Sequence, residues 1–289
     1  ATYTANFAED DAVTIIYAAT TGGSVSPTSE SLKPVTGTAT GSTATAAAGY
    51  HFAGWTKSDG TAVAATAEFK PDKNDNGIYV AETYTAHFAE NDAVTIMYES
   101  ENINKGTVTP GSENVNPATG TASGSTATAK PGYHFTHWTL EQISNGGNQN
   151  IVQALVSIVK TMDETDSKVA TLTGTIVGKY AKENGAYVPV KFVAHFAEDD
   201  AVTITYAATT GGSVSPTSES LKPVTGTATG STATAAAGYH FVNWTDKDGN
   251  EVGTNDSYTP AKVDGLNVAA TYTANFAEDD AVTIIYAAT

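Results

Sequence analysis

The sequence Gly49-Tyr50-His51-Phe52-Ala53-Gly54-Trp55 recurs as residues 132–138 and 238–244, and each copy holds one of the three tryptophans of the chain. In an extended strand Tyr50 and Phe52 share a face, whereas Trp55 has the opposite parity, so a bulge or the end of the strand must bring the tryptophan onto that face. A single Trp in a β module of about 80 residues is most often its core anchor and buries on the order of 200 Å². We therefore predict one aromatic core per copy, made by Tyr50, Phe52, Trp55 and Phe88, by Tyr133, Phe135, Trp138 and Phe196, and by Tyr239, Phe241, Trp244 and Phe276.

A second phrase alternates with the first and divides the chain into repeats. Residues 3–11 (YTANFAEDD) return with small changes at 84–92, 192–200 and 272–280. Because residues 1–20 are also identical to 270–289, the chain resembles one period of a longer array. The predicted division is the last strand of a preceding repeat at 1–9, repeat 1 at 12–90, repeat 2 at 93–198, repeat 3 at 201–278, and the first strand of a following repeat at 281–289.

The local pattern within each repeat is that of β-strands. Val13, Ile15 and Tyr17 alternate with polar or variable positions, which places them on one face of an extended strand. The intervening Ile16 becomes Thr205 in repeat 3, so this position is expected to be only half covered. Turn residues such as those at 58–60 separate the strands. We predict a mainly β fold, a tandem array of small β-rich modules.

Repeat 2 is longer than its neighbours, and the extra residues are assigned to an insertion near 140–175. Apolar residues spaced three to four apart within it predict one helix, from Asn150 to Met162, the only helix expected in the chain. Two roles stay open for this helix: a lid over the sheet of repeat 2, or a surface for interaction within or between chains. Its candidate contact residues are Ile151, Leu155, Ile158 and Met162.

Composition excludes several classes of partner. The chain carries 31 acidic and 14 basic residues, for a net charge of −17, and every basic residue is a lysine. Phosphate backbones and anionic membranes are bound by clustered positive charge, so we expect no nucleic-acid partner. No apolar run reaches the roughly 18–20 residues of a membrane helix, so no membrane insertion is expected of these residues. With no Cys, disulfides and thiol chemistry are absent.

Acidic residues at each junction between repeats are candidate calcium ligands, because Ca²⁺ prefers carboxylate oxygens. The alternative is a solvated acidic turn, which we favour because three carboxylates per joint supply too few ligands. The candidate residues are Asp10, Asp11, Asp92, Asp199, Asp200, Asp279 and Asp280. The six His lack the spacing of a shared ligand pair, and no catalytic motif is present, so we expect no other metal, no cofactor and no enzymatic activity.

Three ordered landmarks carry a resemblance to a known family. A Gly-Ser-Thr start at residues 41–43, the Gly-Tyr-x-Phe-x-x-Trp centre at 49–55 and a closing Thr-Ala-His-Phe at 85–88 recur in order in the later repeats. In this pattern the chain resembles the divergent internalin-type B-repeat family of bacterial surface proteins. The insertion and Val193-Ala194 depart from the family pattern. The resemblance implies a small β-rich module, similar to a β-grasp arrangement, that serves as a stalk or adhesive repeat.

The favoured function is therefore a non-enzymatic stalk or adhesin shaft, extracellular and at the bacterial cell surface, that acts as a semi-rigid spacer. Its expected partners are the other repeats of the same chain. Two alternatives remain open. One is an adhesive module that binds a host glycan or protein, and the other is a subunit of a self-assembling extracellular filament.

Overall fold

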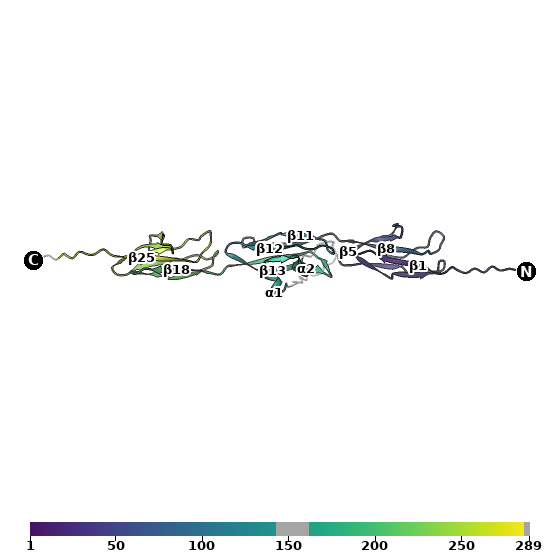
Figure 1. Cartoon of the computed structure of the whole chain (residues 1–289), viewed down its shortest axis with the longest axis horizontal. Coiled ribbons are helices and arrows are strands. Elements are labelled where there is room, and N and C mark those ends of the chain that lie inside the picture. The colour runs from purple at the N-terminus through teal and green to yellow at the C-terminus, as the bar shows by residue number, and fades with distance from the viewer. Residues whose placement is uncertain (143–161, 286–289) are drawn as a thin grey trace, which may run out of the picture. The chain divides into compact units, whose positions relative to one another are not determined.

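The computed structural model describes residues 1–142 and 162–285, and strands make up most of its regular structure (Figure 1). The prediction of a mainly β chain built from three repeats is confirmed. In the described residues no helix is long and apolar enough to cross a lipid bilayer. The chain forms two compact units, unit 1 with Ala1–Glu99, Val108–Thr126 and Trp138–Ala194, and unit 2 with Ser100–Thr107, Ala127–His137 and His195–Thr289.

Repeat 1 consists of two sheets that enclose one core. The larger sheet has the order β3-β1-β8-β5-β6, and the smaller sheet has the order β2-β4-β7. Strands β1 and β8 are parallel, with Tyr17 beside Tyr84, and the other pairs are antiparallel. The strands are β1 Val13–Ala19, β2 Gly23–Ser26, β3 Ser29–Leu32, β4 Ser42–Ala46, β5 Tyr50–Lys57, β6 Ala62–Ala64, β7 Glu68–Phe69 and β8 Glu82–Glu90.

Alternation along β1 decides which side chains enter this core. Ile15 and Tyr17 are 1% and 2% exposed, whereas Ile16 between them is 47% exposed. The half-covered position predicted from the Thr205 substitution is therefore observed at Ile16. The Tyr17 ring meets the Trp55 ring edge-on, with the ring centroids 6.1 Å apart, so the first strand and the central motif share one aromatic cluster.

A bulge in β5 turns Trp55 into the core. The register between β5 and β8 shifts between Phe52 and Gly54, and Gly54 takes a φ of +146° that favours glycine. This shift supplies the change of parity that the sequence requires. Trp55 is fully buried, and its Nε1 donates a hydrogen bond to the Ala67 carbonyl at 3.2 Å, so the indole also has its polar atom paired.

Repeat 3 has the same architecture as repeat 1. Its sheets have the orders β20-β18-β25-β22-β23 and β19-β21-β24, and Trp244 is fully buried with its Nε1 bonded to the Asp256 carbonyl. The strands are β18 Val202–Ala208, β19 Gly212–Ser215, β20 Ser218–Leu221, β21 Ser231–Ala235, β22 Tyr239–Thr245, β23 Glu251–Gly253, β24 Ser257–Tyr258 and β25 Ala270–Glu278.

Repeat 2 keeps the frame and adds short elements. Its described sheets have the orders β11-β9-β17-β13, β10-β12-β14 and β15-β16, and Trp138 Nε1 donates to the Val169 carbonyl at 3.0 Å. The elements are β9 Val94–Ser100, β10 Gly106–Thr109, β11 Ser112–Val115, β12 Gly124–Ala129, β13 Tyr133–Gln142, α1 Glu164–Ser167, β14 Thr171–Thr173, α2 Gly174–Tyr180, β15 Lys182–Glu183, β16 Ala186–Tyr187 and β17 Val190–Glu198.

The helix predicted for repeat 2 falls almost wholly outside the described residues and stays a prediction. Ile151, Leu155 and Ile158 lie outside the described residues, and Met162 is buried but not helical. The described part of repeat 2 adds two further helices, α1 and α2, which are too short to give a visible apolar period. In α2 the hydroxyl of Thr173 accepts a hydrogen bond from the Ile176 amide, as expected of an N-cap.

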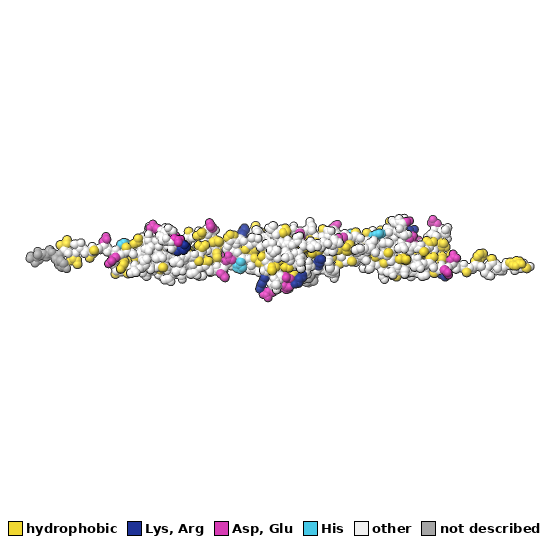
Figure 2. All heavy atoms as spheres, in the orientation of Figure 1, with side chains coloured by type: hydrophobic (Ala, Val, Ile, Leu, Met, Phe, Trp, Pro, Cys, Tyr) yellow, Lys and Arg dark blue, Asp and Glu magenta, His cyan; other side chains and the backbone are white. Residues whose placement is uncertain are grey.

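The boundaries of the insertion also change. Leu140 is a buried residue of β13, not part of the insertion. Additional residues occur after the expected end at 175 as well, because α2, β15 and β16 lie between β14 and β17, where repeat 1 has a loop. Side chains of both charges gather over α1 in Figure 2. Among the described residues Lys179 pairs with Asp163 and Asp166.

We predict that Trp55→Ala lowers the free energy of unfolding of repeat 1 by about 3–5 kcal/mol, because it leaves a large cavity in a close-packed core. Differential scanning calorimetry of the full chain measures the loss. Ile16→Thr is the control, since repeat 3 carries Thr205 there, and it should change stability by only about 0.5 kcal/mol. Equal effects of the two substitutions would contradict the core assignment.

Candidate functional site

The junction between repeats 1 and 2 is formed around one glutamate. Glu90 is the last residue of β8, and its Oε1 accepts hydrogen bonds from the backbone amides of Ala118 and Thr119, both at 2.8 Å. Its Oε2 accepts a third bond from the Thr119 hydroxyl at 2.8 Å. All three residues belong to unit 1. One carboxylate at the end of repeat 1 therefore holds a turn of repeat 2 through three donors, an arrangement we call the glutamate clamp.

The same clamp occurs at two other places. In unit 2, Glu198 at the end of β17 accepts bonds from the amides of Val224 and Thr225, at 2.6 and 2.8 Å, and from the Thr225 hydroxyl at 2.8 Å. Glu9 makes the corresponding three bonds to the turn at residues 35–36 of repeat 1. By contrast, the fourth copy, Glu278, is exposed, and its carboxylate accepts no hydrogen bond within the described ranges.

The receiving turn has a recurrent sequence, Pro-x-Thr-Gly, at residues 34–37, 117–120 and 223–226. The glycine amide closes the turn by donating to a carbonyl four residues earlier, as Gly37 does to Lys33 at 3.0 Å. The amides at the start of such a turn have no partner inside it, like those at a helix N-terminus, and they attract a carboxylate. The threonine adds its hydroxyl as the third donor.

Close apolar packing accompanies the clamp. A β-carbon added to Gly132, which precedes β13, would lie 2.6 Å from Val224 Cγ2 and 2.8 Å from Leu266 Cδ2 of repeat 3. Gly49 similarly lies against Ala118 of repeat 2, whereas Gly238 has open space around it. Any side chain at Gly132 would push the two repeats apart, so the joint requires glycine there for close approach as well as for its φ of +82°.

The hydrogen bonds lower the pKa of the clamp glutamates. For Glu9 and Glu90 the largest cause is the backbone amide of the receiving threonine, followed by its hydroxyl. For Glu198 burial acts in the opposite direction, but the bonds from Thr225 and Val224 outweigh it and the pKa is still lowered. The charged form of each carboxylate is therefore the form that the joint stabilises.

The aspartates predicted as calcium ligands lie beside the clamp but do not converge. Asp199 contacts His134 Nδ1 at 2.9 Å, Asp279 contacts His240 Nδ1 at 3.1 Å, and both backbone amides donate to a glycine carbonyl. Asp10, Asp11, Asp92, Asp200 and Asp280 are exposed. No group of three or more His, Cys, Asp or Glu placed to hold a metal ion occurs in the described parts of the chain. Calcium binding at the junctions stays a prediction.

The predicted core residues occupy the interior to different degrees. The three tryptophans are at most 1% exposed and Phe196 is 3% exposed. The other eight are half-buried: Tyr50, Phe52, Phe88, Tyr133, Phe135, Tyr239, Phe241 and Phe276. Edge-on contacts such as Phe52 with Phe88, at 6.0 Å between centroids, join these rings across the strands.

A second recurrent carboxylate, that of Glu30, was not predicted from the sequence. Glu30 accepts hydrogen bonds from the buried Tyr17 hydroxyl, from the amide and hydroxyl of Thr40 and from the Gly41 amide. Burial, followed by the contact with Glu30, raises the pKa of Tyr17 above its usual value. Glu113 and Glu219 hold the tyrosines of the other repeats in the same way. The sequence feature that marks this carboxylate is the Ser-Glu pair that follows the second strand in all three copies.

We predict that Glu90→Ala loosens the joint between repeats 1 and 2 without unfolding either, because the clamp connects repeats and lies outside both cores. The chain has no cysteine, so Thr45→Cys and Thr128→Cys provide two unique sites for spin labels. The distance distribution from pulsed electron resonance should broaden with Glu90→Ala. Glu278→Ala is the matched control and should leave it unchanged. An unaltered width in the Glu90→Ala chain would exclude the clamp as the restraint.

Acid should have the same effect as the substitution. Since the pKa of each clamp glutamate is lowered when the joint forms, the coupling is fully present above the ordinary Glu pKa of about 4.3 and is lost as the pH falls through the lowered value. The same labelled chain should give a narrow distribution at neutral pH and a reversibly broadened one near pH 3. Broadening at high pH instead would contradict this sign.

Comparison with known families agrees with the landmarks described above. The sequence pattern of the divergent InlB B-repeat domain matches residues 13–92, 96–171 and 202–280. The second match ends at residue 171, before α2 and the closing strand β17, where repeat 2 departs from its neighbours. A comparison with curated proteins gives no significant match. Since the three matches cover most of the chain and repeat the same two-sheet module, the resemblance seen in the sequence is confirmed, and the chain belongs to the divergent InlB B-repeat family.

Proposed function

We propose that this chain is a non-enzymatic spacer from the extracellular part of a bacterial surface protein, in which successive repeats are held semi-rigidly. The observation that carries the proposal is the glutamate clamp. A carboxylate that accepts two amides and one hydroxyl from a single turn restrains both the bending and the twisting of one repeat against the next.

The short connections between repeats support this role. Three residues separate the end of β8 from the start of β9, and three separate β17 from β18. A flexible linker of Gly and Ser would let neighbouring modules reorient freely, whereas these connections lie directly beside the clamp. The net charge of −17 adds a repulsion between repeats that favours extension and is screened beyond roughly 8–10 Å at physiological salt.

The family supports the location and the absence of catalysis. Divergent B-repeats are repeat modules of surface proteins and are typically structural. The described residues repeat one architecture, whereas catalysis requires a special arrangement of side chains at one place. A second candidate function is adhesion. It is favoured by a cavity in repeat 1, because repeat 3 has different residues at some of the positions that line it.

Small-angle X-ray scattering of the full chain tests the spacer proposal. A compact globule of this length has a radius of gyration of about 19 Å, whereas three modules of about 30 Å each in a row give about 26 Å or more. At neutral pH we expect the larger radius of gyration. The Glu90→Ala/Glu198→Ala variant should give a smaller average radius of gyration and a broader range of conformations. A globular profile would contradict the spacer, and a scattering mass that rises with concentration would indicate a filament subunit.

A further inference from the structure

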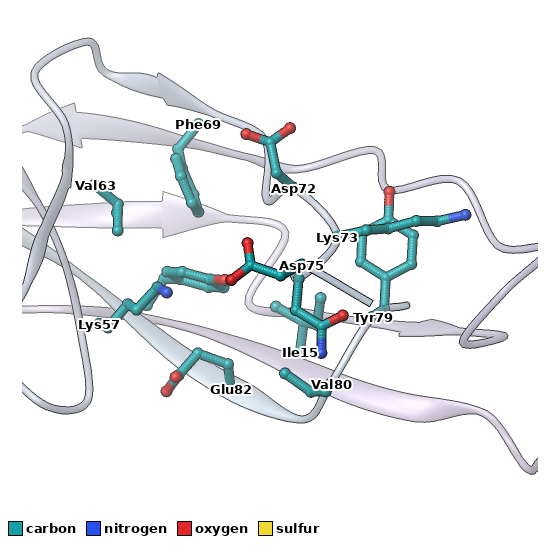
Figure 3. Close-up of a pocket in the computed structure, with 12 residues that line it drawn as sticks. Ile15, Lys57, Val63, Phe69, Asp72, Lys73, Asp75, Tyr79, Val80 and Glu82 are labelled. Carbon is teal, nitrogen blue, oxygen red and sulfur yellow. The ribbon is translucent and has the colours of Figure 1, made fainter. Parts of the chain in front are cut away.

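Repeat 1 contains a cavity of about 400 Å³ between its larger sheet and the loop that joins β7 to β8 (Figure 3). Its lining has an apolar floor and a charged rim. The floor consists of Ile15, Val63, Phe69, Tyr79 and Tyr84, and the charged residues are Lys57, Asp72, Lys73, Asp75 and Glu82. In Figure 3 Asp72 and Glu82 stand on two sides of the cavity, with Asp75 between them.

The tyrosine in the floor has an unpaired polar atom. Tyr84 is 7% exposed and lines the cavity, and no hydrogen bond to its hydroxyl occurs in the part of the chain that the structure describes. Burial raises its pKa, and the charges of Glu82 and Asp72 raise it further. No fully buried side-chain nitrogen or oxygen lacks a partner among the described residues, so the Tyr84 hydroxyl is accessible and can pair with a ligand. The cavity therefore suits a ligand that brings a polar group close to these carboxylates.

The rim has more free negative than positive charge. Asp72 and Asp75 form no hydrogen bond or ion pair among the described residues, and the bonds that Glu82 accepts from Ser58 and Thr83 all go to Oε1, which leaves Oε2 available. Lys73, in contrast, donates to the Val35 carbonyl and lies over the Tyr79 ring. Three carboxylates thus face a cavity in which only Lys57 offers an uncommitted cation.

Repeat 3 provides an internal comparison, because residues 17–52 and 206–241 are identical. Glu82 pairs with Ile15 in β1, and its counterpart Ala270 pairs with Ile204 in β18. Lys73 and Lys262 make the same bond to the receiving turn, which aligns Asp72 with Ala261. The two-sheet module of repeat 3 folds without these two carboxylates, so folding of the module does not require them.

We propose that this cavity binds a lysine side chain from a basic polypeptide. The methylene stem would cover the apolar floor, and the ammonium group would lie among Asp72, Asp75 and Glu82. An ammonium group has three donors that rotate freely, which matches three separate carboxylates better than the planar fork of an arginine does. A sugar fits less well, because the floor provides one free hydroxyl and would leave several sugar hydroxyls unpaired.

The binding test uses the full chain and the probe Nα-acetyl-lysine-N-methylamide, followed by NMR of the Tyr79 and Tyr84 ring resonances. We expect saturable shifts that weaken as salt is added. The neutral probe Nα-acetyl-norleucine-N-methylamide has the same stem without the charge and should bind at least about fivefold more weakly. No saturable shift with the lysine probe, equal binding of the norleucine probe, or tighter binding of glucosamine would each overturn the proposal.

A double variant tests whether Asp72 and Glu82 form the binding site. Asp72→Ala/Glu82→Ala reproduces the residues of repeat 3 and should keep the fold, while it weakens lysine binding by roughly fivefold or more. Asp248→Ala, which removes an exposed carboxylate from a hairpin turn of repeat 3, is the matched control and should leave the affinity unchanged. Unchanged affinity in the double variant would overturn the assignment. Because these residues lie outside the clamp, failure here leaves the spacer proposal standing.

Discussion

The structure depends on a carboxylate held by neutral donors at the end of a strand. Glu90 and Glu198 stand where a closing strand leaves its sheet, so the rigidity of the sheet fixes the position of each carboxylate. The turn that it binds is closed by its own glycine amide, and its first amides have no partner within the turn. A strand end and a closed turn therefore meet at one charged group, which joins one repeat to the next through three short bonds.

The repeats divide into a shared frame and variable loops. Residues 17–52 of repeat 1 are identical to their counterparts in repeat 3, and they contain the receiving turn and the Tyr17–Glu30 contact. The differences begin after Phe52 and include the β5–β6 hairpin and the loop from β7 to β8. Repeat 2 places α2 in that last connection. The frame thus supplies the receiving turn, and the loops add contacts at the joint, such as that of Leu266 with Gly132. The proposed lysine-binding cavity lies against the loop from β7 to β8.

Sequence patterns predicted the parts of the fold that depend on period and parity. The opposite parity of Phe52 and Trp55 required a bulge, and the register shift between Phe52 and Gly54 provides one. Helix α2 could not be predicted in this way, because it is seven residues long and begins with glycine, so no apolar period identifies it. The hydrogen bonds of Glu9 could not be predicted from the acidic run that contains Asp10 and Asp11, because the donors that bind Glu9 lie 26 and 27 residues further along the chain.

A joint made in this way responds to solution conditions differently from one made by ion pairs. Salt screens the attraction between exposed opposite charges, but the clamp carboxylates are held mainly by neutral amides and a hydroxyl, and the charges of Lys33 and Lys222 contribute less than these hydrogen bonds to the lowered pKa of Glu9 and Glu198. An acidic chain with no arginine has few cations with which to build ion-pair joints, and Lys33 and Lys222 donate to backbone carbonyls at the junctions instead. The negative charge of the repeats and their joints are therefore compatible, because the carboxylates that make the repeats repel one another are in part the groups that join them.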